Sequence, residues 1–282
     1  MKIVECPRDA MQGLHDFIPT ATKSSYINQL LKVGFHTIDF GSFVSPKAIP
    51  QLRDTAEVLD QLDHSSTTSK LLAIVANLRG AQDAVQFEPI DYLGFPLSIS
   101  ETFQQRNTNK SIGQALEQLQ EIQNLCKKHN KTLVTYISMG FGNPYGETFN
   151  EEIVAEFTKK LVDMEVEIVS LADTIGVAQP DLIDRIFTYA LASFPDTEIG
   201  AHFHSTPDTV LEKLEAAYAA GCRRFDAAIK GYGGCPMAKD DLTGNIATEK
   251  LIDFLESKEV DTGLDKTAFN EAMLMSSGVF LG

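Results

Sequence analysis

The chain has few cysteines and no long apolar run, and both absences exclude whole classes of protein. Its four cysteines show no close pairing, no CxxC motif and no zinc-finger spacing, so we expect free thiols in a reducing compartment. No stretch approaches the roughly 18 consecutive apolar residues that a membrane-spanning helix needs. The first residues lead straight into an expected strand, without the hydrophobic segment of a signal peptide. We therefore expect a cytoplasmic protein that does not cross a membrane.

Positive charge is also scarce. The chain carries 24 basic and 39 acidic residues, which gives a net charge of −15. This balance argues against a protein that relies on nucleic-acid phosphates or on an anionic membrane surface. It does not exclude a small anionic substrate, because a local cation or a bound metal decides that interaction. With 43% hydrophobic and 22% charged residues, the chain has the composition of a globular protein with a full core.

Short apolar runs alternate with segments of helical periodicity along the whole chain. Eight runs are expected to be strands: residues 2–5, 37–40, 71–76, 92–95, 133–138, 167–172, 198–204 and 224–228. The clearest helices lie between or just after them, at residues 23–33, 111–129, 150–164, 180–193, 207–219 and 248–257, with a shorter one near 79–86. Residues 265–277 are expected to form an extra helix beyond the last of these.

This alternation implies right-handed crossovers and a parallel sheet. Eight units fit a (β/α)8 TIM barrel, for which roughly 250 residues is typical. An open, doubly wound sheet is the alternative, since the number of units does not establish closure. No Gly-x-Gly-x-x-Gly follows the first strand, so the dinucleotide-binding form of that alternative lacks its signature. No linker divides the chain, and we expect a single TIM-barrel domain over residues 1–282 with an extra C-terminal helix.

Polar residues gather where the expected strands end, which in a barrel is where chemistry takes place. His202 and His204 are two residues apart on a strand, so their imidazoles project to the same side. Asp9 follows the first strand, and Asn245 lies beyond the eighth. A carboxylate, two imidazoles and an amide oxygen suit a divalent cation such as Mg²⁺, Mn²⁺, Fe²⁺ or Co²⁺. The histidines alone would equally fit a hydrogen-bonded pair at a strand end.

Two further residues are candidates for chemistry. Arg8 offers a fixed cation that stabilises developing negative charge, or else a salt bridge between strand ends. Cys235 stands in a glycine-rich loop after the eighth strand, where a thiol can donate or accept a proton, or be a spectator. The paired glycines Gly233 and Gly234 favour the interpretation of this loop as a lid.

Together these residues resemble the 3-hydroxy-3-methylglutaryl-CoA lyases, within a superfamily of metal-dependent barrel lyases and synthases. The resemblance covers nearly the whole chain, through residues 3–12, 42–47, 170–177, 202–204, 233–236 and 244–249. The Arg-Asp and His-x-His motifs are shared by the superfamily. The stretches Ser-Phe-Val-Ser-Pro-Lys and Gly-Gly-Cys-Pro favour the lyase branch.

The resemblance implies an activity and a role for each candidate. The metal, Mg²⁺ or Mn²⁺, would be held by Asp9, His202, His204 and Asn245. The enzyme would cleave 3-hydroxy-3-methylglutaryl-CoA to acetyl-CoA and acetoacetate in a retro-Claisen step, with Asp9 or His202 as the base. Arg8 would stabilise the enolate and Cys235 would protonate it. The substrate would be oriented by Gln12, Asp39, Ser42, Asp173 and Thr174. A homodimer is expected on the same ground.

Some positions depart from the family pattern. Asp39 stands where Glu is usual, Ser205 follows the second histidine in place of Asp or Asn, and His15 stands where Lys is common. These changes bear on which acyl-CoA is cleaved more than on the lyase chemistry. The alternatives are a related acyl-CoA/2-oxo acid aldolase or synthase, a lyase for another 3-hydroxyacyl-CoA, and a barrel that binds metal or ligand without catalysis. Binding alone would require neither Arg8 nor Cys235.

Overall fold

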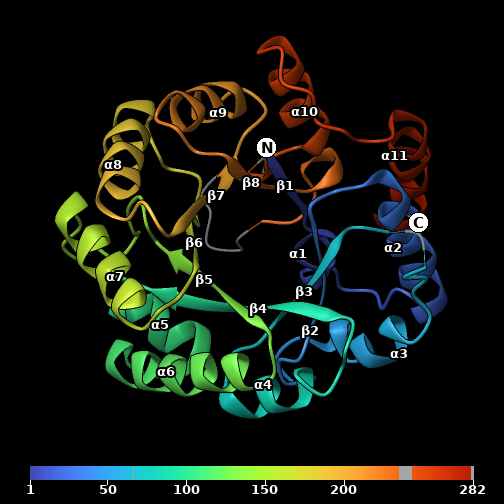
Figure 1. The fold of residues 1–282 in the computed structure, drawn as a ribbon, viewed down its shortest axis with the longest axis horizontal. Helices are drawn as coiled ribbons and strands as arrows, with labels where there is room; N and C mark the ends of the chain where they lie inside the picture. Colours follow the sequence, from blue (N-terminus) through green and yellow to red (C-terminus); the bar gives the residue numbers. More distant parts are fainter. Residues whose placement is uncertain (66, 235–242, 281–282) are drawn as a thin grey trace.

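Eight parallel strands close on themselves to form a barrel (Figure 1). The computed structural model describes residues 1–65, 67–234 and 243–280. The barrel strands are β1 (Lys2–Glu5), β2 (Thr37–Ser42), β3 (Lys70–Ile74), β4 (Ile90–Ser98), β5 (Thr132–Ser138), β6 (Ile168–Asp173), β7 (Glu198–Ser205) and β8 (Arg224–Ala227). Each strand pairs with the next, and β1 pairs with β8, so the sheet has no open edge. Closure confirms the TIM barrel and excludes the open sheet.

The longer helices surround the barrel on its outer face, whereas the short α1 lies inside that ring (Figure 1). The helices are α1 (Pro7–Gln12), α2 (Thr20–Val33), α3 (Thr55–Leu59), α4 (Leu78–Ala84), α5 (Glu101–Thr108), α6 (Ile112–Lys128), α7 (Glu151–Asp163), α8 (Pro180–Ser193), α9 (Val210–Ala219), α10 (Thr248–Ser257) and α11 (Lys266–Phe280). Every helix expected from the sequence is present. The helices α1, α3 and α5, with six, five and eight residues, were not expected; of the short helices, only the seven-residue α4 was.

Local sequence explains where the longer helices begin. At the start of α6, the Ser111 side chain accepts from the Gln114 backbone N–H, and the Gln114 side chain accepts from the Ser111 N–H. This capping box satisfies two donors that the first helical turn leaves without partners. Asn150 caps α7 in the same position through the Ile153 N–H.

The strands are buried on both faces. All six residues of β2 and of β6 are buried, because one side faces the barrel interior and the other faces the helices. The cysteines among the described residues, Cys6, Cys126 and Cys222, are free and buried, as expected for a chain without disulfides. No helix among the described residues is long and apolar enough to cross a membrane.

The extra C-terminal helix α11 packs against α2, which Figure 1 shows side by side in red and blue. The Gln29 side chain donates to the Ala268 carbonyl at 2.9 Å, and the rings of Tyr26 and Phe280 meet edge to face at 5.8 Å. The expected helix over residues 265–277 is therefore confirmed and runs three residues further. It joins the end of the described chain to its first long helix.

A ninth strand, β9 (Gly244–Asn245), was not expected. It runs antiparallel to β7 and pairs Asn245 with His204. Two residues give no period-2 pattern from which a strand could be predicted. Its effect is to bring residue 245 beside the histidine motif, at the end of the barrel where function is expected.

Glu5 provides a pH-dependent test of this fold. Its side chain is fully buried at the end of β1 and accepts from the Ile229 N–H at 2.9 Å and the Thr248 hydroxyl at 2.6 Å. Burial raises the pKa of Glu5 from 4.5 to about 8. Between pH 4.5 and about pH 8, Glu5 has lost its proton in the unfolded chain but keeps it in the folded chain. Glu5 therefore lowers the free energy of unfolding as the pH rises through this range.

We expect Glu5→Gln to abolish that loss. The free energy of unfolding of both proteins is measured in urea. The difference between them, variant minus parent, should increase steadily from pH 5 to pH 8, by up to about 1.4 kcal/mol per pH unit. Taking the difference between the two proteins cancels the other titrating groups. A difference that does not change with pH would contradict the assignment.

Candidate active site

A cavity of about 520 Å³ opens at the carboxyl ends of the barrel strands. Six residues expected at the site line it: Arg8, Asp9, Gln12, Thr174, His202 and His204. Its other walls are largely apolar, with Val44, Ile49, Ile74, Pro96, Phe103 and Ala172 among them. Polar groups that converge in an apolar cleft at this end of a barrel are the usual form of an active site.

Asp9, His202 and His204 form a compact cluster of ligand atoms, all within 4.8 Å of one another. The His204 Nδ1 lies 2.8 Å from the Thr174 carbonyl oxygen, and the His202 Nδ1 lies 3.1 Å from Asp226 Oδ2. Since a carbonyl and a carboxylate accept, both Nδ1 atoms carry a proton, and in the neutral form of each ring Nε2 presents a lone pair. The Nε2 of His204 is buried, has no hydrogen-bond partner among the described residues, and lies 4.0 Å from Asp9 Oδ2.

The charges in the cluster suit a cation. Burial would raise the pKa of Asp9, but Arg8 and the two histidines lower it to about 2, so the carboxylate is ionised. Burial and the neighbouring His202 lower the pKa of His204, which favours its neutral form. Burial also acts to lower the pKa of His202, but the hydrogen bond and charge of Asp226 raise it overall, so a metal ion would compete with a proton for the Nε2 of this ring. An anionic oxygen and two imidazole nitrogens around an unpartnered lone pair fit a divalent metal ion.

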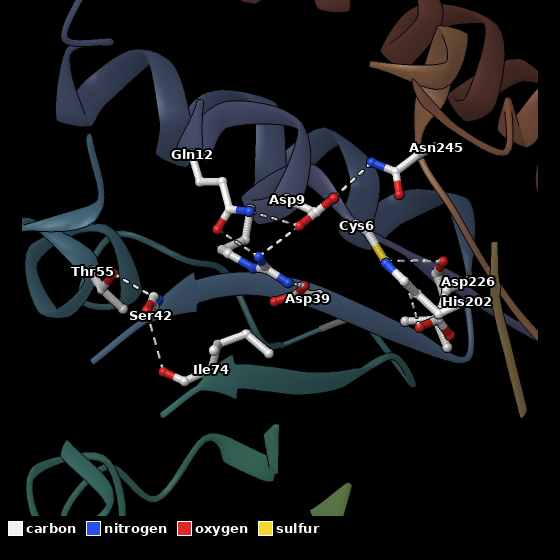
Figure 2. Close-up of polar contacts among 12 residues, drawn as sticks. Cys6, Asp9, Gln12, Asp39, Ser42, Thr55, Ile74, His202, Asp226 and Asn245 are labelled. Atoms are coloured by element: carbon white, nitrogen blue, oxygen red, sulfur yellow. Dashed lines mark hydrogen bonds and ion pairs between the residues drawn. The ribbon is translucent and has the colours of Figure 1, made fainter. Parts of the chain in front are cut away.

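Asn245 lies next to Asp9 but presents its nitrogen (Figure 2). The amide Nδ2 donates to Asp9 Oδ2 and to the Tyr232 carbonyl, each at 2.8 Å. Because this one amide atom lies within hydrogen-bond distance of two oxygens that accept, it is the nitrogen, which donates. The role of the amide oxygen as a fourth metal ligand stays a prediction.

Arg8 is held in place from three sides. Its Nε and Nη2 donate to Asp39 Oδ2 at 2.9 and 2.5 Å, and its Nη1 donates to Asp9 Oδ1 at 2.8 Å and to Gln12 Oε1 at 2.9 Å. The guanidinium therefore makes the salt bridge between strand ends and also faces the cavity. Asp39, which is 1% exposed, contacts Arg8 rather than the cavity. Burial raises the pKa of Asp39 to about 6, although Arg8 opposes this.

The remaining expected residues divide between the cavity and the wall behind it. Gln12 and Thr174 line the cavity, and the Thr174 hydroxyl accepts from the Met139 N–H at 2.8 Å. Ser42 donates to the Ile74 carbonyl at 3.3 Å and lies outside the cavity lining. Asp173 accepts from the Val177 and Ala178 N–H groups, also behind the wall. Direct contact of these residues with substrate stays a prediction.

Asp226, which fixes the tautomer of His202, was not expected as a site residue. It lies opposite His202 where β7 and β8 pair, and it is 3% exposed. The available signal was an acidic residue within a strand whose other residues are buried. Tyr136 was also missed: its ring lies 5.5 Å from the His202 ring and lines the cavity.

Lys213 is a second positioning residue that the sequence did not reveal. Its ammonium is 1% exposed and donates to Asp173 Oδ2 at 2.6 Å, to the His204 carbonyl at 2.9 Å and to the Gly176 carbonyl at 3.0 Å. Each of the three N–H groups of the ammonium thus has an acceptor. One of the acceptors is the backbone carbonyl of His204, a candidate metal ligand. The signal was a lysine on the buried stripe of α9, between Val210 and Leu214.

Cys235 lies outside the described residues. Two glycines precede it, and Gly233 approaches the cluster closely: a Cβ there would lie 2.8 Å from Asn245 Nδ2 and 2.9 Å from the Asp9 carbonyl oxygen. Their φ angles of 89° and 137° are ones that other residues rarely adopt. The chain that leads to Cys235 therefore passes directly against Asp9.

We expect Lys213→Met to weaken Mn²⁺ binding by about 10–100-fold, because His204 and Asp173 lose their common anchor. Calorimetric titration of the metal-free protein with Mn²⁺ measures this without substrate. Lys258→Met removes a more exposed lysine, paired with Glu215, and serves as the control. If the folded Lys213→Met variant binds Mn²⁺ as tightly as the control, the anchoring role is wrong.

The comparisons with known proteins agree with this geometry. The HMGL-like family model matches residues 2–275. A hydroxymethylglutaryl-CoA lyase of Bacillus subtilis is 36% identical over 258 residues, which are 92% of this chain and 85% of the relative. A 3-hydroxy-3-isohexenylglutaryl-CoA/hydroxy-methylglutaryl-CoA lyase of Pseudomonas aeruginosa is 33% identical over 96% of this chain and 90% of the relative.

A solved structure has the same fold along almost its whole length. The HMG-CoA lyase of Acinetobacter baumannii, in complex with coenzyme A and 3-methylmalate, superimposes with a TM-score of 0.90 at 32% identity. The match covers 99% of this chain and 91% of that one. The barrel, the cluster at its strand ends and these relatives lead to one conclusion: this chain belongs to the HMGL-like family.

Proposed function

We propose that this chain is a divalent-metal-dependent carbon–carbon lyase that cleaves 3-hydroxy-3-methylglutaryl-CoA to acetyl-CoA and acetoacetate. The observation that carries the proposal is the Asp9–His202–His204 cluster beside a fixed Arg8 in one cavity. Relatives named for this activity match the chain over more than nine-tenths of its length. The bound coenzyme A in a solved relative supports an acyl-CoA substrate.

Asp9, His202 and His204 would hold the metal, Mg²⁺ or Mn²⁺, with the Asn245 amide oxygen as the proposed fourth ligand. When bound, such a cation acts as a Lewis acid that makes a coordinated hydroxyl easier to deprotonate. Asp226 and the Thr174 carbonyl, by accepting from the two Nδ1 atoms, would leave both Nε2 atoms for the cation.

Breaking the bond between C2 and C3 leaves an electron pair on the acetyl-CoA fragment, which becomes an enolate. Arg8 would stabilise that negative charge, since its guanidinium is fixed before the reaction starts by Asp39, Asp9 and Gln12. Apolar neighbours such as Ile74 and Phe103 limit water around the charge and so strengthen the interaction. Arg8 therefore has two roles, as an ion-pair partner and as a catalytic cation.

Two proton transfers complete the reaction. Of the two expected bases, Asp9 would remove the proton of the 3-hydroxyl, because His202, with its proton on Nδ1 and its Nε2 on the metal, would have no lone pair left for it. The C3 fragment would leave as the ketone acetoacetate. Cys235 would then give its thiol proton to the enolate carbon and yield acetyl-CoA. The roles of the base and of Cys235 rest on the family resemblance.

Several further properties belong to the proposal. A homodimer follows from the family resemblance alone. A cytoplasmic location rests on the pattern of the cysteines. A single domain over residues 1–282 is supported by the match of one family model to residues 2–275.

The direct test is an assay of acetoacetate release from 3-hydroxy-3-methylglutaryl-CoA with added Mn²⁺. We expect cleavage that a chelator abolishes and that Mn²⁺ or Mg²⁺ restores. The same assay with 3-hydroxy-3-isohexenylglutaryl-CoA examines the second substrate class for which one relative is named. No cleavage of the first thioester, with turnover of another 3-hydroxyacyl-CoA or of a 2-oxo acid, would replace the proposal by its alternatives.

Arg8→Gln separates catalysis from metal binding. We expect turnover to fall by at least about 10²–10³-fold, because a preorganised cation is lost at the site of developing charge. Calorimetry should show that Mn²⁺ still binds, because no proposed ligand is removed. Arg185→Gln, at an exposed pair with Glu151, should behave as the parent enzyme. Loss of Mn²⁺ binding together with activity would contradict the role given to Arg8.

A further inference from the structure

His202 belongs to a second cluster of possible metal ligands, formed with Cys6 and Asp226. One ligand atom from each of the three lies within 4.8 Å of the others. Figure 2 shows the sulfur of Cys6 beside the His202 ring and Asp226. The residues come from three neighbouring parts of the barrel: Cys6 follows β1, Asp226 lies on β8, and His202 lies on β7.

Two of the three ligand groups in this second cluster, Asp226 and Cys6, are poorly satisfied by the described residues. Asp226 Oδ2 accepts from His202, but Asp226 Oδ1 is buried without a hydrogen-bond donor there, and only the charge of the nearby Arg224 offsets it. The Cys6 thiol makes one contact, to the Val4 carbonyl at 3.7 Å, which is weak even for sulfur. Asp226 and Cys6 are 3% and 1% exposed, so water does not readily take the missing places. A buried carboxylate oxygen without a partner is costly unless a proton or a cation meets it.

The local charge also favours a cation over a free thiolate. Burial and the nearby carboxylates of Asp226, Asp39 and Asp9 raise the pKa of the Cys6 thiol, while Arg8 opposes them. Without a metal the sulfur therefore stays protonated and inert. A bound cation reverses this balance, because a coordinating thiol loses its proton outright.

We propose that Cys6, His202 and Asp226 form a second site, for a thiophilic divalent cation such as Zn²⁺, and that its occupation inhibits the enzyme. Sulfur, imidazole nitrogen and carboxylate oxygen together are a donor set that Zn²⁺ and Cd²⁺ favour. Mg²⁺ requires oxygen ligands and gains little from a thiolate. The site therefore distinguishes inhibiting metals from Mg²⁺ by the chemistry of Cys6.

Inhibition follows from the two nitrogens of one imidazole. The Nδ1 of His202 faces Asp226 and carries a proton, which leaves the lone pair of Nε2 for the Asp9–His204 side. A cation bound at Nδ1 requires the lone pair there, so the ring proton moves to Nε2 and His202 is lost as a ligand of the catalytic metal. The Cys6 proton is released to solvent and no electron is transferred. The inhibition rests on the proposed function; the binding does not.

Binding is tested with Cd²⁺ alone on the metal-free protein, by the ultraviolet absorption of a thiolate–cadmium bond. All proteins carry Cys235→Ala, so that a thiol from the glycine-rich loop does not contribute. We expect the absorption in this background and in its Cys126→Ala derivative, which removes a buried cysteine on α6. It should be lost in the Cys6→Ala derivative. Absorption that persists without Cys6 would overturn the proposal.

Inhibition is tested by adding Zn²⁺ to the Mn²⁺-loaded enzyme with its natural Cys235. We expect Cys6→Ala to keep the Mn²⁺-dependent activity and to raise the inhibitory Zn²⁺ concentration by at least about tenfold. Cys126→Ala should be inhibited like the parent enzyme. Equal inhibition of Cys6→Ala would mean that Zn²⁺ acts elsewhere, and the proposal would fall.

Two controls keep the outcomes distinct. If Cys6→Ala does not fold, Cys6→Ser keeps nearly the same volume, is a poor ligand for soft metals and gives the same test. If the enzyme does not cleave the thioester at all, the proposed function fails while the Cd²⁺ titration still decides whether the second site exists.

Discussion

The site depends on two hydrogen bonds that fix the protons of its histidines. Asp226 and the Thr174 carbonyl accept from the Nδ1 atoms of His202 and His204, so each Nε2 is left as a base that faces Asp9. Without these acceptors either ring could carry its proton toward the cluster and would cease to be a ligand. The chemistry we propose follows from this constraint, since a metal, a substrate hydroxyl and an enolate are all handled from that side.

The groups that face the cavity are held by groups that do not. Arg8 is fixed by Asp39, and the backbone of His204 is fixed by Lys213. Such buried charged partners add little net stability, because desolvation offsets much of their attraction. Their value is in geometry: they place a cation and two imidazoles before any substrate arrives. This accounts for the number of ionised groups buried at one end of the barrel.

The barrel could be predicted from the sequence because its signals are long and repeated. Eight apolar runs and the helices between them fall where the structure has them, since strands buried on both faces leave an unmistakable pattern. Short elements could not be predicted: β9 has two residues and α1 has six, which is too few for a period. The residues that face the cluster were found because they stand at strand ends.

The supporting residues escaped prediction for a different reason. Asp226 lies in a strand whose residues are all buried, and Lys213 lies on the buried stripe of α9. Their partners are distant in the sequence. Only the register of β7 against β8 and the packing of α9 against the barrel show what they touch. Asp39 also has a partner that the sequence did not reveal, the guanidinium of Arg8, while its expected contact with substrate stays a prediction.

The central claim is that both imidazoles, through their unprotonated nitrogens, bind one divalent cation together with Asp9. Pulsed electron paramagnetic resonance of the Mn²⁺-loaded protein tests this directly, because it detects nitrogen nuclei bonded to the metal. Our account predicts coupling to two histidine nitrogens, reduced to one in His204→Ala. A Mn²⁺ signal without nitrogen coupling, or one that His204→Ala leaves unchanged, would contradict it.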